Sequence, residues 1–164
     1  MHDIMEDLGI DVEVGKAYRI LEHARDIHHE DQGLQYAMLE KYRELILSSN
    51  PESKFTLLTA ADGPRVFKRL YLRFVAQKAG FLQGCRPFVC LDGCHMKSYH
   101  GGIVLAAVGR DGNEGMFPLA IVVVEQETIS TWRWFMEQFF EDYGSAEENG
   151  WVFMSDKQKV YCLF

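Results

Sequence analysis

Apolar and aromatic side chains recur at every third or fourth position near the start of the chain. The two series are Tyr18, Leu21, Ala24 and Ile27, then Tyr36, Leu39, Tyr42 and Ile46. This spacing predicts a pair of amphipathic helices within Lys16–Ser48, with a break near Gly33. Asn50-Pro51 should end the second helix, because proline cannot continue a helix.

In Lys54–Thr59, Phe55, Leu57 and Thr59 alternate onto one side, which predicts a strand. Ala61-Asp62-Gly63-Pro64 is a turn signal, so we expect a hairpin whose second strand reaches about Arg73. A short helix ending at Gly80 should follow. The basic residues here form either a local phosphate-facing patch or a solvated strand face. They are Arg65, Lys68, Arg69 and Arg73.

Shorter apolar runs, separated by turn residues, mark the second half of the chain. These runs are Phe88–Leu91, Gly102–Gly109 and Phe117–Glu125. Asp111–Gly115 is a turn between the last two, and short connections of this kind predict an antiparallel meander. Gly93, Gly101 and Gly102 are interpreted as turn glycines.

Helical spacing returns after the predicted meander. The aromatic series comprises Trp132, Phe135, Met136, Phe139, Phe140 and Tyr143, and Ser130 is the predicted N-cap. Trp151–Met154 is a continuous apolar run, which predicts a strand buried on both faces. The order β-β-β-α-β indicates an α/β fold with an incomplete ribonuclease H-like core. We place this core in residues 84–164, after a helical and hairpin region in residues 1–83.

Two of the predicted strands lead directly into an aspartate. Asp92 follows the run Phe88–Leu91, and Asp156 follows the run Trp151–Met154 and Ser155. Carboxylates fixed at strand ends supply hard oxygen ligands to Mg²⁺, and a two-metal site for phosphoryl transfer needs such a pair. Alternatively, both aspartates are ordinary strand-end residues that cap turns.

Cysteine and histidine gather around the first aspartate. Cys90, Cys94, His95 and His100 are residue types that bind zinc, but Cys-x3-Cys followed directly by His is not a usual zinc spacing. The other interpretation is packed cysteines and surface histidines. Without a secretory context, free thiols are favoured over disulfides.

Charge and hydropathy limit the partners and the compartment. A net charge of −7, from 17 basic and 24 acidic residues, argues against strong unaided binding to DNA. The N-terminus has neither a basic start nor a continuous apolar segment, so no signal peptide is predicted. No apolar run approaches the ~18 residues of a membrane span, and we expect a soluble intracellular chain.

Seven short motifs occur together in one order. They are Gly80-Phe81-x-x-Gly84-Cys85-Arg86-Pro87, Leu91-Asp92-Gly93-Cys94-His95-Met96-Lys97, Tyr99-x-Gly101-Gly102, Phe117-Pro118-Leu119-Ala120, Glu125-x-Glu127, Trp132-x-Trp134-Phe135 and Ser155-Asp156-x-Gln158-Lys159. In this combination the chain, from about Tyr18 to Lys159, resembles the plant Mutator-like element (MULE) transposase domain. The resemblance implies a ribonuclease H-like DDE core in which three acidic residues bind two divalent metal ions for DNA strand cleavage and transfer.

By position, Asp92 and Asp156 correspond to the first and second acidic residues, and so to the catalytic and metal-binding positions. The third, a glutamate on a later helix, has no counterpart, because residues 157–164 contain no acid. The family pattern also continues with Gly-Leu where this chain has Val160-Tyr161, which suggests a truncated or frame-shifted copy.

Other residues near these motifs have roles of lesser weight. Glu125 and Glu127 could substitute as metal ligands, but they precede a helix, where acidic side chains favour the helix dipole, so a structural or supporting role is expected. We assign Trp132 to the same supporting group. Arg86 and Lys97 are candidates for DNA contact, with solvated surface as the alternative.

Two functions remain at this point. One is a fragment of a MULE transposase that binds Mg²⁺ or Mn²⁺ weakly, binds DNA weakly or not at all by itself, and is inactive alone. The other is a non-catalytic, transposon-derived protein that acts through protein interaction, including self-association through an exposed strand edge. The family resemblance implies a nuclear location.

Overall fold

The computed structural model describes residues 15–16, 18–20, 23, 34–60, 66–97 and 100–155. The chain forms two compact units, Met1–Leu39 and Glu40–Phe164. In the first unit, the described residues 15–16, 18–20, 23 and 34–37 are helical. Most of the first predicted helix, including the break at Gly33, lies outside the described residues.

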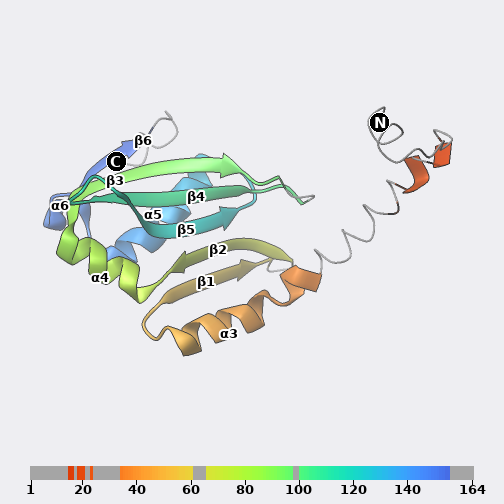
Figure 1. The fold of residues 1–164 in the computed structure, drawn as a ribbon, viewed down its shortest axis with the longest axis horizontal. Helices are drawn as coiled ribbons and strands as arrows, with labels where there is room; N and C mark the ends of the chain where they lie inside the picture. The colour runs from red at the N-terminus through yellow and green to blue at the C-terminus, as the bar shows by residue number, and fades with distance from the viewer. Residues whose placement is uncertain are drawn as a thin grey trace. The chain divides into compact units, whose positions relative to one another are not determined.

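The second predicted helix is confirmed as α3, Leu39–Ser49, which ends directly before Asn50-Pro51. Its Ile46 is buried, and its Tyr42 meets Phe55 edge to face, with ring centroids 6.3 Å apart. These contacts place α3 against the first strand of the sheet (Figure 1).

The described residues of the second unit form one mixed sheet of six strands. Its strands are β1 (Lys54–Thr59), β2 (Phe67–Arg73), β3 (Cys85–His95), β4 (Ile103–Asp111), β5 (Met116–Val124) and β6 (Val152–Ser155). The order across the sheet is β1-β2-β5-β4-β3-β6. The predicted hairpin and the predicted β3–β4–β5 meander are both antiparallel, as expected. The hairpin turn, residues 61–64, lies outside the described residues.

The hairpin and the meander join edge to edge. Strand β2 pairs antiparallel with β5, with Tyr71 opposite Val122. Both predicted regions, residues 1–83 and 84–164, therefore contribute strands to the same sheet (Figure 1).

Helix α4 runs from Val75 to Gly84, four residues past its predicted end at Gly80. Gly80 does not terminate the helix. A Cβ at this position would lie 2.7 Å from the ring of Phe117 on β5, so the glycine allows the helix to approach the sheet closely. The helix instead ends where the chain enters β3 at Cys85.

Helix α5, Ile129–Tyr143, has the predicted aromatic stripe but a different cap. Its N-cap is Thr128, not Ser130: Oγ1 of Thr128 accepts from the Thr131 amide at 3.2 Å, and Oγ1 of Thr131 accepts from the Thr128 amide at 2.9 Å. Such a reciprocal pair satisfies two amides that a helix start leaves without partners. Ser130 is already inside the helix.

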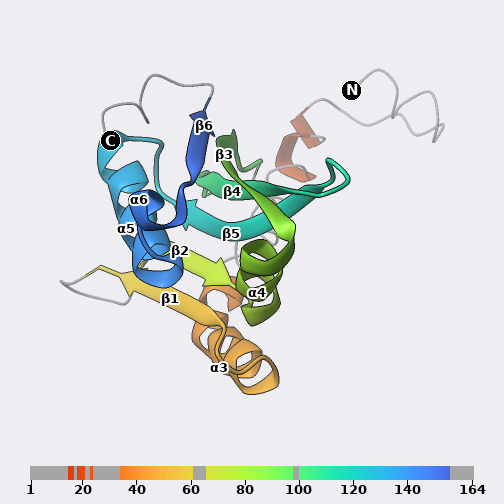
Figure 2. The ribbon, with the colours of Figure 1, turned by 90° about the vertical axis from the view of Figure 1, so that its left-hand side faces the viewer.

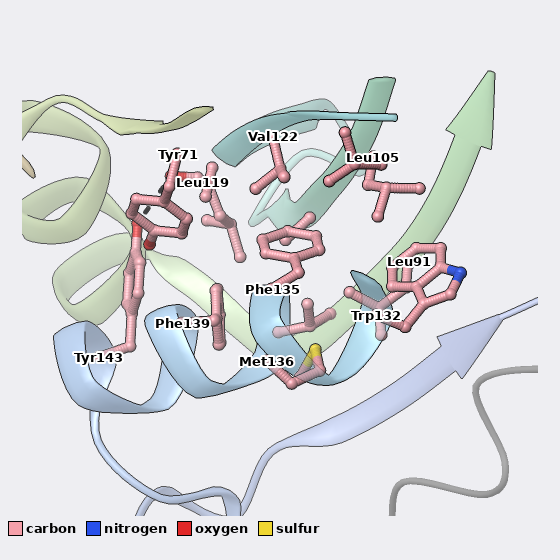
Figure 3. Packing of buried hydrophobic residues seen from close by; sticks show 14 of the residues in the cluster. Tyr71, Leu91, Leu105, Leu119, Val122, Trp132, Phe135, Met136, Phe139 and Tyr143 are labelled. Atoms are coloured by element: carbon pink, nitrogen blue, oxygen red, sulfur yellow. Dashed lines mark hydrogen bonds between the residues drawn. The ribbon is translucent and has the colours of Figure 1, made fainter. Parts of the chain in front are cut away.

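The main core lies between one face of the sheet and helices α4 and α5 (Figures 2 and 3). Its fully buried large side chains include Tyr71, Leu91, Leu105, Leu119, Val122, Trp132, Phe135 and Phe139. The rings of Phe139 and Tyr143 stack with centroids 4.5 Å apart. Burying side chains of this size contributes about 1.5–3 kcal/mol each, so this layer fixes α5 against the sheet.

Arg69 and Arg73 of β2 do not form part of a phosphate-facing patch. Arg73 is 5% exposed, and its guanidinium binds both carboxylate oxygens of Asp142 on α5, at 2.7 and 2.5 Å. Arg69 likewise turns to Glu125 and lies over the ring of Trp134. These side chains point to the face that α5 covers. Arg65 lies outside the described residues.

Strand β6 is not buried on both faces. It lies at the sheet edge, parallel to β3, and its side chains alternate. Phe153 packs against Phe139 and Phe140 of α5, whereas Val152 and Met154 are 61% and 51% exposed. The run Trp151–Met154 is continuously apolar because this edge strand carries apolar side chains on its exposed side as well as on its buried side.

Candidate metal site at the ends of β3 and β6

Asp92 lies in the second half of β3 and is exposed. Its neighbour Leu91 is 1% exposed and packs into the core, so Asp92 points to the opposite face of the sheet, the side away from α5. Oδ1 of Asp92 accepts a hydrogen bond of 2.7 Å from the amide of Gly93. The strand thus presents a carboxylate that its own backbone helps to orient.

Strand β6 places Ser155, the first residue of the second acidic motif, beside β3, the strand that carries Asp92. The parallel register pairs Cys90 with Met154 and Leu91 with Ser155. The carboxyl ends of adjacent parallel strands are where open α/β sheets bind ligands. The predicted ligand Asp156 lies outside the described residues, so the structure places its motif only as far as Ser155.

Glu127 lies at the same end of the sheet, on the α5 side of β3. It is half-buried, and its Oε1 accepts from Nε1 of Trp132 at 3.3 Å. A Cβ built on Gly93 would lie 3.6 Å from Oε1 of Glu127 and 3.0 Å from Leu105, so the Glu127 carboxylate lies on the same side of β3 as the open face of Gly93. In Figure 3 the indole of Trp132 lies beside Leu91 with its nitrogen turned away from the core.

Glu125 has a different environment, although it is only two residues away. Its carboxylate receives two N–H groups of Arg69, with contacts of 3.0 and 2.7 Å. The hydrogen bond from Arg69 lowers the pKa of Glu125 below its ordinary value, although partial burial opposes this. Glu125 therefore ties β2 to the end of β5.

The two candidate DNA contacts lie at opposite ends of β3. Arg86 is at the start of the strand, and its guanidinium pairs with Glu114 of the β4–β5 turn at 2.5 Å. Lys97 is exposed, two residues past the end of the strand at His95. Lys97 alone of the two lies at the end of β3 that carries Asp92.

Gly93 is the residue whose role the sequence interpretation missed. It is a strand residue, paired with Leu105, rather than a turn glycine. A glycine inside a strand often marks close approach by another group, and this signal was available. Gly101 and Gly102, with φ of 63° and 103°, are turn glycines as predicted.

Within the described residues, no three His, Cys, Asp or Glu side chains lie close enough together to hold a metal ion. The described part of the site thus offers one predicted ligand, the exposed Asp92, whose hard carboxylate oxygens suit Mg²⁺ or Mn²⁺.

No described helix is both long and apolar enough to span a membrane.

Comparison with known families finds a match in the second half of the chain. Residues 88–162 match the MULE transposase domain. The match begins in β3 and includes both acidic motifs and the whole of β4, β5, α5 and β6. The predicted resemblance is confirmed over these residues. No curated protein sequence and no solved structure matches the chain.

Proposed function

We propose that this chain has a MULE transposase-derived function in which Asp92 and Asp156 bind a divalent metal ion. The parallel register of β3 and β6 carries the proposal. It pairs Leu91 with Ser155, and the next residue along each chain segment is an aspartate. Continuing that register by one residue would set the two carboxylates side by side, as a shared metal site requires.

The metal ion would be Mg²⁺ or Mn²⁺, because carboxylates are ligands for hard cations. Its chemistry in a DDE core is to neutralise charge on the attacking and leaving oxygens during strand cleavage and transfer. Asp92 contributes an exposed carboxylate on a rigid strand. With few carboxylates, most coordination positions fall to water, so binding is expected to be weak.

The 164-residue polypeptide is proposed to be inactive by itself. Within the described residues no group of three His, Cys, Asp or Glu side chains forms a metal site, so the described part of the polypeptide offers no complete set of three acidic ligands. Positioned charge supplies much of the acceleration of phosphoryl transfer, and an incomplete ligand set weakens it.

DNA is the proposed partner, in the nucleus of a plant cell, by analogy with the family. The net charge of −7 and the pairing of Arg86 with Glu114 support only weak DNA binding by this polypeptide, with Lys97 as the contact closest in sequence to Asp92. We propose a ribonuclease H-like core in residues 84–164, supported by the β3–β4–β5 meander, α5 and the parallel β6.

The deciding experiment uses purified chain, supercoiled plasmid and Mg²⁺ or Mn²⁺. Asp92→Ala tests the site, and Glu137→Ala, which removes an exposed acid of α5, is the matched control. We expect no metal-dependent nicking but measurable Mn²⁺ binding that Asp92→Ala abolishes. Metal-dependent nicking lost only in Asp92→Ala would contradict inactivity, and Mn²⁺ binding unaffected by Asp92→Ala would contradict the metal site.

A second candidate function is non-catalytic interaction between proteins. The exposed Val152 and Met154 on edge strand β6 favour it, because an apolar edge can pair with another chain. Self-association that increases with concentration and disappears in Met154→Lys would support this candidate. A monodisperse monomer at all concentrations would count against it.

A further inference from the structure

The two edges of the sheet differ in how they are protected against pairing with another chain. Edge strand β1 carries Lys54 and has a register shift between Leu58 and Thr59, and a lysine and a bulge both discourage edge pairing. Edge strand β6, Val152–Ser155, has no charged residue and keeps a regular parallel register with β3. No described strand pairs with its other side (Figure 1). The β6 edge is therefore better suited than the β1 edge to accept another strand.

The exposed side chains of β6 are apolar and lie on the sheet face opposite α5. Val152 and Met154 are both exposed, while Phe153 between them packs against α5. In the parallel register, Val152 lies beside Phe88 and Met154 beside Cys90. Apolar side chains therefore reach the rim of the sheet, where a further strand would cover them.

Charge on either side of β6 favours a second copy of this chain as the added strand. Glu147 and Glu148 are exposed and precede the strand, whereas Lys157 and Lys159 follow it in the sequence, with one acid, Asp156. In an antiparallel pair of β6 strands, the start of each strand lies beside the end of the other. The acidic start of each copy then meets the basic end of the other, whereas a parallel pair would bring like charges together.

Symmetry limits the register of such a pair. A twofold axis that joins two identical strand edges is perpendicular to the sheet, so residues opposite each other point to the same face. One residue of β6 must therefore lie opposite its own copy. If this residue is Phe153, Val152 of each copy lies opposite Met154 of the other, and both exposed apolar side chains are covered.

We propose that two copies of this chain associate through an antiparallel β6–β6 pair in which Phe153 lies opposite its own copy. The inference rests on the interaction function given above as the second candidate, and it specifies the partner and the register of that contact. Strand β6 has four residues and spans about 13 Å, so the contact is short. A contact of this length buries less than the roughly 800 Å² per partner of a stable complex, so the dimer dissociates on dilution.

Sedimentation velocity of the full chain over a range of concentrations tests the contact. The unmodified chain should show a monomer–dimer equilibrium. Met154→Lys and Val152→Lys should each weaken it by at least about 10-fold, because each places a charge inside the pair. Met116→Lys is the matched control: it makes the same change at an exposed methionine of β5, two strands away from β3 and β6, and should leave the equilibrium unchanged. Circular dichroism verifies that each variant is folded.

Cysteine pairs test the register. Val152→Cys mixed with Met154→Cys should give a disulfide-linked dimer under oxidising conditions, because Cα atoms of opposite residues lie about 4.5–5.5 Å apart, within reach of a disulfide. Either variant alone places its two cysteines diagonally, about 7–8 Å apart, which is too far. Each should therefore stay at the background that the native cysteines of the unmodified chain set.

The results separate this inference from the functions proposed above. A chain that stays monomeric at every concentration would overturn both the interaction function and the β6 contact. Self-association that persists in both lysine variants of β6 would keep the interaction function and refute the contact, and cross-linking of either cysteine variant alone above background would refute the register. Asp92→Ala should associate like the unmodified chain, because the contact does not involve the metal site.

Discussion

Asp142 and Asp92 are carboxylates of the same unit with opposite surroundings. The side chain of Asp142 is 4% exposed, and its carboxylate is bound by Arg73 and by the hydroxyl of Tyr71, with Nζ of Lys78 at 3.7 Å. Lys78 also donates to the main-chain oxygen of Asp142. Asp92 is exposed, and among the described residues the hydrogen bond that orients it comes from the Gly93 amide.

The difference separates a charge used for stability from one suited to binding. A buried carboxylate needs its cations permanently, because desolvation makes an unpaired buried charge expensive. An exposed carboxylate oriented by backbone can exchange water for a cation from solution. Four experiments test this contrast, beginning with the one that should change stability most.

Removing each carboxylate should have very different effects on stability. Asp142→Ala leaves Arg73 buried without its counter-ion and should lower the free energy of unfolding by about 3–5 kcal/mol. Asp92→Ala removes an exposed side chain and should change it by less than about 0.5 kcal/mol. Urea unfolding of both variants measures this, and equal losses would show that Asp92 is also structural.

Alkaline pH should lower the free energy of unfolding through the buried tyrosines Tyr71 and Tyr143. Burial, and then the charge of Asp142, raise the pKa of Tyr71 far above its ordinary value of 10.0, and burial also raises the pKa of Tyr143. Because both pKa values are raised in the folded state, this contribution is complete below about pH 10 and is lost as pH increases further.

The free energy of unfolding should therefore fall above about pH 10, with each buried tyrosine adding up to about 1.4 kcal/mol per pH unit. Tyr71→Phe removes one titrating group and should make this slope shallower. A variant with the same alkaline slope as the unmodified chain would mean that Tyr71 does not resist ionisation in the folded protein.

Mn²⁺ should stabilise the chain through Asp92. At a free Mn²⁺ concentration ten times the dissociation constant, binding to the folded state adds about 1.4 kcal/mol. The resulting rise in melting temperature should disappear in Asp92→Ala and on adding a chelator, but not in Glu137→Ala. A rise that persists in Asp92→Ala would place the ion elsewhere.

The pair of Glu125 and Arg69 should give the smallest effect. Because Arg69 lowers the pKa of Glu125 in the folded state, the stabilisation is present at neutral pH and is lost as pH falls through the acidic range below about 4.5. Glu125→Gln should cost less than about 1 kcal/mol at pH 7, since the Glu125 side chain is 45% exposed. Thermal melts at pH 7 and at about pH 3 should show this difference shrinking in acid.

Elements defined by local pattern were predictable. Lys54–Thr59 alternates and is β1 with the predicted bounds, and the aromatic stripe of α5 follows helical spacing. The N-cap was harder, because Thr128, Ser130 and Thr131 are all cap-forming residues within four positions. Which of the three is the N-cap depends on where the backbone changes from extended to helical, and the local sequence does not fix that position.

Features that depend on distant residues were not predictable. Nothing near Arg73 in sequence indicates Asp142 as its partner, and nothing near β2 indicates that it pairs with β5. The apolar run before Asp92 was visible, but β3 continues to His95, so Asp92 lies inside the strand and not at its end as predicted. The position of Glu127 on the Gly93 side of β3 depends on how the β5–α5 connection folds back. The predicted pairing with Asp156 remains a prediction.

The pairing of β2 with β5 also affects the order in which the chain can fold. Leu70 and Val123 are about fifty residues apart, so the second edge of β2 stays open until β5 has been synthesised. At roughly 5–20 residues per second, this interval lasts several seconds on the ribosome. Because loops of this length must close before non-local strands pair, the sheet is expected to form slowly, and an early hairpin with an open edge is the species most exposed to misassembly during that time.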